Sequence, residues 1–543
     1  MSRPNPLLLT AVLAVFAALF GGLSLAQGGL YLDTHEGDTY HLLDILYRME
    51  QGLDPHVDFV TPLGLFAFLP IVLFMQAGLG VGMAILWAEI AIAAAMVPVV
   101  AYAAATRLPR RTAYAFGLFT IGLILAMTYG GAASGASISM HYNRWAWALA
   151  FTMLTLAILP ARGSTRQTLD GILIGVLAAC LLLIKITFFV CLLPPVAIAL
   201  LYRGQRRAFA AAALAGLVVV AAVTAGYGLD HWLGYYNDLR IVAGSEVRPF
   251  VGVPFNQIVA GPIHVGGSIL AILAVFLLRQ SGRIREGLIL VLLIPAFLYI
   301  TYQNFGNDPK WYVFIAVLLM ALRPAPGEHT VAGIDLSDGA AWLAAAAIAL
   351  YFPSLFNMAL SPINHAALET DRFIPMVPSR DGESDIFIRL DRANTITAEV
   401  YLDERVPVWA KYAEDAERLP PVEIGGVTFP HCEFLAGSRA FFVEIAADLE
   451  RANIPEGSQF YTTDILTAIW LFGPYAPLRN GAPWYYGEFS GLENADYVLV
   501  PKCSFVSRVH RIMIDELTGA EVPLTLVRDN DLYALFEPDR GDL

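Results

Sequence analysis

The chain has 543 residues, 57% of them hydrophobic and only 15% charged, and its formal net charge is −13. Soluble domains are about a quarter charged, so this composition excludes an ordinary soluble protein, and the lack of a basic stripe excludes nucleic acid as a partner. Residues 360–543 carry 30 acidic and 15 basic side chains, whereas residues 1–359 carry 17 and 19. We therefore expect a mainly α polytopic membrane module over 1–359 and an acidic soluble domain over 360–543.

The first module contains repeated apolar stretches of a length that crosses a bilayer. We expect eleven spans, near 7–26, 80–105, 113–131, 144–160, 169–184, 187–202, 207–228, 264–279, 287–303, 311–323 and 338–358. A further apolar segment, 63–77, has about fifteen residues, a length typical of a segment that enters the membrane only partly. Residues 24–26 (Ser-Leu-Ala) have the small-x-small form of a signal-peptide cleavage site, but we expect the first span to remain as an anchor.

Arginine clusters predict the orientation, because basic residues favour the cytoplasmic side of a membrane protein. The clusters lie at 107–111, 162–166, 203–207, 279–285 and 323. A full crossing by 63–77 would place the first two clusters outside, whereas partial insertion places all of them inside. We therefore expect the N-terminus inside and the C-terminal domain outside.

The first outer segment, 27–79, begins with several acidic residues directly after the first span. Asp33, Glu36 and Asp38 would lie at the boundary between membrane and water, and Asp58 follows in the same segment. Carboxylates near hydrocarbon are costly unless they face water or a polar cavity. Several acids beside a span therefore indicate a functional site, although any single one could equally be a solvated loop charge or a helix cap.

Cationic and amide side chains from other outer segments are predicted to lie on the same side of the membrane. Together with Asp58, we assign them to substrate binding. They are Asn143 and Arg144 at the start of a span, Lys185 between two spans, Arg240 and Arg248 in the loop 229–263, and Asn307 and Lys310 in the turn 303–311. Lys185 could instead extend its amine to the interface, and Arg144 could be an interfacial anchor beside Trp145 and Trp147. The histidines of the first segment lack the spacing of zinc ligands, so we expect no dedicated metal site.

Acids in one segment and cations from several others suit the transfer of a sugar from a lipid-phosphate donor. A carboxylate is needed to deprotonate or orient the acceptor. Positive groups are needed to hold the phosphate leaving group and to stabilise its developing charge. Both must lie at the membrane surface, where the lipid carrier presents its head group.

The first outer segment reads Asp38-Thr-Tyr40-His-Leu-Leu and then Gly52-Leu-Asp54-Pro55-His-Val-Asp58-Phe59, and Pro62-Leu63 opens the short apolar segment. With an N-terminal span, many further spans and a soluble C-terminal domain, the chain resembles integral-membrane glycosyltransferases of the GT-C superfamily. This superfamily includes protein O-mannosyltransferases and the aminoarabinose transferase of lipid A. Lys185, in the segment Lys185-Ile-Thr187, is similar to a lysine that recurs midway in several such chains. Two departures are a split acidic pair, Glu36-Gly37-Asp38, and the lack of a WWDYG motif.

The resemblance implies a polyprenyl-phosphate-linked sugar as donor and a lipid, glycan or protein outside the cytoplasm as acceptor. It implies a multi-pass protein of the bacterial inner membrane that also contacts membrane lipid. Asp38 would be the acidic centre, assisted by Glu36 or Asp33, and Arg144, Lys185 and Lys310 would contact phosphate. Metal dependence varies across the superfamily, so a divalent cation stays open as a cofactor.

The C-terminal region alternates helix-like and strand-like stretches, which predicts an α/β or α+β domain. We expect a helix over Phe441–Ala452 and strands over 459–463, 497–501, 524–527 and 532–536. Its two cysteines, Cys432 and Cys503, would pair in an oxidising compartment or could be two unpaired residues. The domain would cap the membrane site or recognise the acceptor.

Two other classes of function stay open. A transporter or lipid flippase would have broken helices near the bilayer midplane and an internal repeat, and no clear repeat is present. A non-catalytic envelope assembly subunit would tolerate replacement of the acids in the first outer segment.

Overall fold

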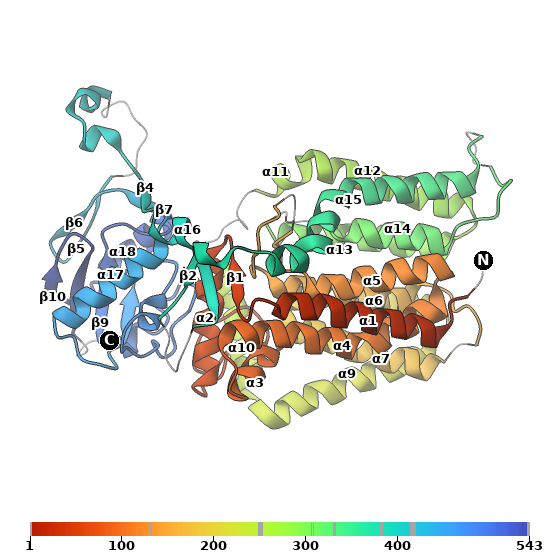
Figure 1. Cartoon of the computed structure of the whole chain (residues 1–543), viewed down its shortest axis with the longest axis horizontal. Helices are drawn as coiled ribbons and strands as arrows, with labels where there is room; N and C mark the ends of the chain where they lie inside the picture. The colour runs from red at the N-terminus through yellow and green to blue at the C-terminus, as the bar shows by residue number, and fades with distance from the viewer. Residues whose placement is uncertain are drawn as a thin grey trace.

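The computed structural model describes residues 3–130, 133–164, 166–247, 254–305, 307, 309–329, 333–378, 384–412 and 420–539. The molecule is elongated, with a long helical bundle at one end and the C-terminal domain at the other (Figure 1). The N-terminus lies at the end of the bundle that is farther from the C-terminal domain (Figure 1).

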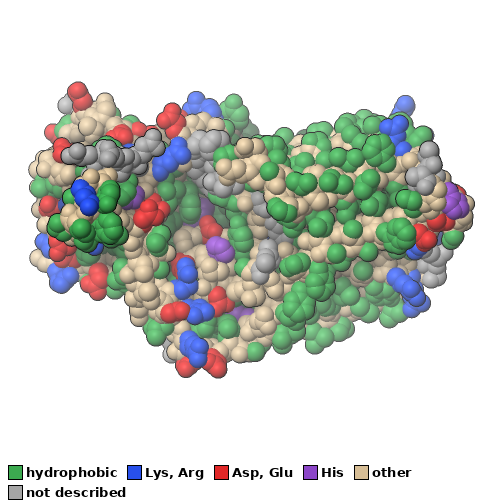
Figure 2. Space-filling view, turned by 90° about the horizontal axis from the view of Figure 1, so that it is seen from above, with side chains coloured by type: hydrophobic (Ala, Val, Ile, Leu, Met, Phe, Trp, Pro, Cys, Tyr) green, Lys and Arg blue, Asp and Glu red, His purple; other side chains and the backbone are tan. Residues whose placement is uncertain are grey.

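The bundle is built from apolar helices that run along its length. They are α1 (Pro6–Leu25), α4 (Val81–Arg107), α5 (Arg110–Leu125), α6 (His141–Ile158), α7 (Gln167–Ile184), α8 (Ile186–Tyr202), α9 (Arg206–Tyr227), α12 (Pro262–Gln280), α13 (Ile284–Tyr302), α14 (Trp311–Ala321) and α15 (Leu336–Ala366). Among the described residues, seven helices are long and apolar enough to cross a membrane, namely α1, α4, α7, α9, α12, α13 and α15. Hydrophobic side chains cover the bundle surface, and charged ones gather at its ends (Figure 2). The chain is therefore a polytopic membrane protein, and the count of eleven crossings stays a prediction.

Two helices differ in extent from the expected spans. Helix α5 ends at Leu125 rather than near 131, because the chain turns back over the end of the bundle. There the Met127 amide donates to Ser361 Oγ at 3.0 Å and the Met127 carbonyl accepts from the Ser137 amide at 2.8 Å. Helix α15 continues to Ala366, so the domain boundary expected at 359/360 falls inside a helix.

The segment between α1 and α4 is largely structured. It contains β1 (Leu30–Leu32), α2 (Glu36–Glu50), the short helix η1 (Leu65–Ala67) and α3 (Leu69–Gln76). Helix α3 has eight residues, about 12 Å at the usual rise, so it is shorter than the hydrocarbon core of about 30 Å. Whether it dips into the bilayer stays a prediction. Outside the bundle, α10 (Asp230–Gly244) and α11 (Phe255–Ala260) connect α9 to α12.

The C-terminal domain mixes strands and helices, as expected. Its main sheet has the order β10-β11-β9-β8, formed by β8 (Phe460–Thr462), β9 (Tyr497–Pro501), β10 (Leu524–Asp529) and β11 (Tyr533–Pro538), with α17 (Ser438–Arg451) and α18 (Ser507–Gly519). Smaller pairs are β4 (Thr397–Val400) with β7 (Cys432–Ala436) and β5 (Val422–Ile424) with β6 (Val427–Phe429). Cys432 and Cys503 form a disulfide, which joins β7 to the segment before α18.

The first outer segment is part of the C-terminal domain's sheet structure rather than a separate loop. Strand β1 pairs in parallel with β3 (Ile386–Arg389), which also pairs with β2 (Phe373–Pro375). The Asp385 carboxylate accepts hydrogen bonds from the backbone amides of Gly82 and Met83, at 2.9 and 2.8 Å. These amides belong to the first turn of α4 and have no partner within the helix. A residue of the C-terminal domain therefore caps a helix of the membrane bundle.

Helix α2 is joined to the C-terminal domain by a buried ion pair. Asp44 and Arg48 lie one turn apart and are fully buried. Arg48 donates to the Leu478 carbonyl at 2.6 Å, and Trp470 Nε1 donates to Asp44 at 2.9 Å. Removing one partner of a buried pair is strongly destabilising, because an uncompensated charge is then left buried. The pair holds α2, and with it the acids of its first turn, in a defined position.

Candidate functional site

Asp38 and His35 begin α2 and contact the loop that precedes α6. His35 is the N-cap residue of α2, with a left-handed backbone at φ 65°. Its Nδ1 lies 2.9 Å from Ser137 Oγ, and its ring stacks on Tyr129 with centroids 4.5 Å apart. The Ser139 hydroxyl donates to Asp38 Oδ2. Residues of the segment before α6 thus contact the half-buried side chains at the start of α2.

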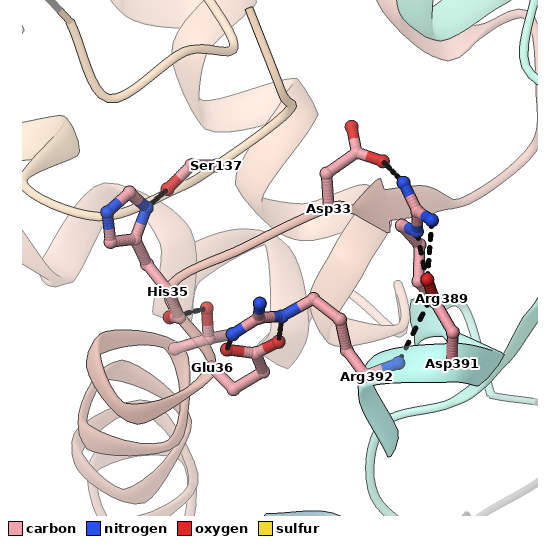
Figure 3. Close-up of polar contacts among 8 residues, drawn as sticks. Asp33, His35, Glu36, Ser137, Arg389, Asp391 and Arg392 are labelled. Carbon is pink, nitrogen blue, oxygen red and sulfur yellow. Dashed lines mark hydrogen bonds and ion pairs between the residues drawn. The ribbon is translucent and has the colours of Figure 1, made fainter. Parts of the chain in front are cut away.

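The other two acids predicted as catalytic contact arginines of the C-terminal domain (Figure 3). Arg392, in α16 (Leu390–Asn394), donates through Nε and Nη2 to the two carboxylate oxygens of Glu36. Asp33 accepts from the Ala136 amide at 2.8 Å and lies 4.0 Å from a guanidinium nitrogen of Arg389. Among the described residues, Asp38 is therefore the one of the three acids outside an ion pair.

Lys185 lies in the turn between α7 and α8 and contacts two other helix ends. Its Nζ donates to Asn304 Oδ1 at 2.5 Å and to Asn143 Oδ1 at 3.4 Å, and it lies 5.5 Å from the centroid of the Tyr142 ring. Asn143 is in the first turn of α6 and Asn304 follows α13. The amine is half-buried among polar and aromatic groups, which differs from a lysine that only extends into the interface.

The acids of the first segment and Lys185 lie at the same end of the bundle. The Gly64 amide donates to the Ile184 carbonyl at 3.1 Å. A Cβ atom at Gly64 would lie 2.2 Å from the Leu183 carbonyl oxygen, so only glycine allows this approach. Ser139 and Asn143 lie four positions apart in the sequence, and they contact Asp38 and Lys185 respectively. One chain segment therefore links the carboxylate to the amine.

Arg144 is buried and balanced by an acid inside a membrane helix. Its Nη2 lies 3.4 Å from Glu89 Oε1 on α4, and its Nη1 donates to the Thr128 carbonyl at 2.9 Å. Glu89, Arg144 and Ser137 line a small cavity of about 10 Å³. Arg144 thus contacts the segment before α6 at Thr128, and its charge is paired with that of Glu89.

The remaining predicted substrate contacts are more dispersed. Lys310 is buried at the start of α14, and Asn307 donates to the Tyr129 carbonyl at 3.3 Å. Asp58 accepts from the Asp54 amide at 2.8 Å, which closes a local turn. Arg240 is exposed on α10. Arg248 lies outside the described residues.

Several residues of this site were not predicted from the sequence. Glu89 carried a readable signal, because an acid within an apolar span is by default a functional candidate. Ser137, Ser139, Arg389 and Arg392 carried none, since each gains its role only by meeting a partner far away in the chain. Within the part of the chain that the structure describes, no group of three or more His, Cys, Asp or Glu side chains could hold a metal ion.

Comparison with protein-family models, with curated proteins and with solved structures found no match to this chain.

Proposed function

We propose that this protein is a membrane glycosyltransferase that moves a sugar from a polyprenyl-phosphate donor to a lipid, glycan or protein acceptor outside the cytoplasm. The observation that carries the proposal is that Asp38, which accepts from Ser139, and Lys185, which donates to Asn143, lie at the same end of the bundle. A carboxylate and an amine at one boundary of an apolar bundle match the needs of transfer from a lipid phosphate.

In this proposal Asp38 accepts the proton of the acceptor hydroxyl as that oxygen attacks the sugar. Lys185 holds the donor phosphate and stabilises the charge that develops on it as the bond to the sugar breaks. Glu36 and Asp33 position the segment through their arginine partners. The C-terminal domain lies outside the cytoplasm of a bacterial cell and covers the site.

The test is a transfer assay with the protein in nanodiscs, supplied with a panel of radiolabelled polyprenyl-phosphate sugars and an extract of envelope lipids and glycans. Asp38→Asn should abolish transfer, because the amide keeps the size of the side chain but cannot take a proton. Asp371→Asn is the matched control, since Asp371 is exposed in the C-terminal domain. Near-normal transfer by Asp38→Asn would move the catalytic role to Asp33 or Glu36. Failure of every donor to react would refute the proposal.

A transporter is the second candidate, and the buried Glu89–Arg144 pair favours it. Ionisable residues inside a membrane bundle often mark a path for a substrate or for protons. A transporter would carry a polyprenyl-phosphate sugar across liposomes with the sugar bond intact. The same nanodisc and liposome preparations therefore separate the two candidates.

A further inference from the structure

His35, the N-cap residue of α2, has a left-handed backbone conformation. Left-handed φ values are uncommon for residues other than glycine, and histidine is one of the few residues enriched there. The side chain of an N-cap residue usually accepts a hydrogen bond from a backbone amide of the first turn, and the His35 side chain accepts none. The conformation instead directs the imidazole away from α2 toward the loop 126–140 (Figure 3).

The imidazole is held from two sides. Tyr129 stacks on its face, with an angle of 27° between the ring planes, and Ser137 Oγ contacts Nδ1 at 2.9 Å. Among the described residues, none forms a hydrogen bond with the other ring nitrogen, Nε2. The ring is thus oriented while one nitrogen stays available to a proton.

A short chain of hydrogen bonds leads from His35 to Asp38. Ser137 Oγ accepts from the Ser139 amide at 3.1 Å, and the Ser139 hydroxyl donates to Asp38. In the neutral tautomer that carries its proton on Nε2, Nδ1 accepts the hydrogen bond that the Ser137 hydroxyl donates. A protonated imidazole donates from both nitrogens, so the bond to Ser137 must then reverse and the hydroxyl proton must turn elsewhere.

We propose that His35 is a positioning residue which, through Ser137 and Ser139, holds the Asp38 carboxylate in its working orientation only while the imidazole is neutral. The effect of this role on catalysis rests on the proposed function. The order of the loop itself is a separate property of the folded protein. The proposed role makes the site sensitive to acid through the segment that contains Ser137 and Ser139.

The charged groups that face His35 make the proposal sharply testable. Burial lowers the pKa of His35 below its usual value, Asp38 and Glu36 raise it, and Arg392 lowers it. The loop 126–140 contains no charged residue. The net effect is a lowered pKa, so the His35 imidazole binds a proton less readily than an exposed histidine does.

Hydrogen exchange of the intact protein in nanodiscs, measured from pH 5 to 8 without donor and corrected for intrinsic rates, tests the linkage. Peptides that contain Ser137 and Ser139 should lose protection on acidification in the wild type. His35→Asn should remove this pH dependence, and asparagine also tolerates the left-handed backbone. His329→Asn, in the loop between α14 and α15, is the control.

Two variants that break the same ion pair should shift the midpoint in opposite directions. Arg392→Gln removes a positive charge and should raise the midpoint pH, whereas Glu36→Gln removes a negative charge and should lower it. If the ion pair had only a structural role, the midpoint pH would shift in the same direction in both variants, and that result would overturn the proposal. Unchanged pH dependence in His35→Asn would also overturn it.

The transfer assay then links the proposal to catalysis. At saturating donor, the fall in kcat on the acid side should move to lower pH in His35→Asn, with the KM for donor unchanged. An identical acid limb in His35→Asn and wild type would overturn the positioning role. A protein that shows the expected exchange pattern but transfers no sugar would instead refute the proposed function.

Discussion

Arg392 in α16 and Glu36 in the first turn of α2 form a two-bond ion pair across 356 positions of sequence. Both guanidinium contacts reach the same carboxylate, an arrangement that gives specific geometry as well as attraction. The pair connects the C-terminal domain to the acidic segment that follows the first membrane helix, next to the parallel pairing of β1 with β3.

Breaking this pair should loosen the contact between the two parts of the protein. Arg392→Ala should lower the free energy of unfolding by about 1 kcal/mol, a modest value because the arginine is partly exposed and the pair is screened by water. A double-mutant cycle with Glu36→Ala, read by thermal unfolding in nanodiscs, measures the coupling. The control is the exposed pair Arg372–Glu369, which should show no measurable coupling. Equal values for the two pairs would contradict the prediction.

Lys185 should contribute to donor binding. Lys185→Met removes a charge-assisted contact worth about 1.5–3 kcal/mol, which corresponds to roughly ten- to a hundred-fold weaker donor use. Lys185→Arg should retain part of the activity, because the charge is kept while the geometry of the donor group changes. Donor titration in nanodiscs measures the effect at matched protein levels. An unchanged apparent donor affinity in Lys185→Met would return this residue to the role of an interfacial lysine.

The disulfide between Cys432 and Cys503 should stabilise the C-terminal domain. It closes a sequence separation of 71 residues, and cross-links of this kind typically contribute about 2–4 kcal/mol, mainly by restricting the unfolded chain. Cys432→Ser with Cys503→Ser should lower the unfolding temperature of the domain. Mass spectrometry of a non-reduced digest should detect the linked peptides. Free thiols at both positions would contradict the pairing.

The C-terminal domain should be accessible from outside the cytoplasm. Arg405 and Lys411 are exposed in the short helices η3 (Leu402–Glu404) and η4 (Pro407–Tyr412) and their connection, which project from the domain (Figure 1). Trypsin added to intact spheroplasts should cleave there. Arg206 and Arg207, exposed at the start of α9, should be cleaved only after lysis. The reverse pattern would overturn the orientation predicted from the arginine clusters.

The sequence by itself determined most of the helices and several strands, because apolar runs and alternation are properties of neighbouring residues. The expected span 169–184 corresponds to α7, and the expected strand 497–501 is β9. Prediction failed where a distant partner decides the boundary. Helix α5 ends early because the chain turns back after Leu125, where the Met127 amide donates a hydrogen bond to Ser361 of α15.

The composition of the candidate site was only partly predictable. Acids near the first span and Lys185 were visible as polar residues beside apolar ones. Their different partners were decided by the tertiary structure, in which Glu36 pairs with Arg392 of α16, Asp33 lies near Arg389 of β3 and Asp38 accepts from Ser139. The physical reason is that ion pairs and hydrogen bonds act over a few ångströms. Which groups come that close depends on the pairing of β1 with β3, and no local pattern in the chain encodes it.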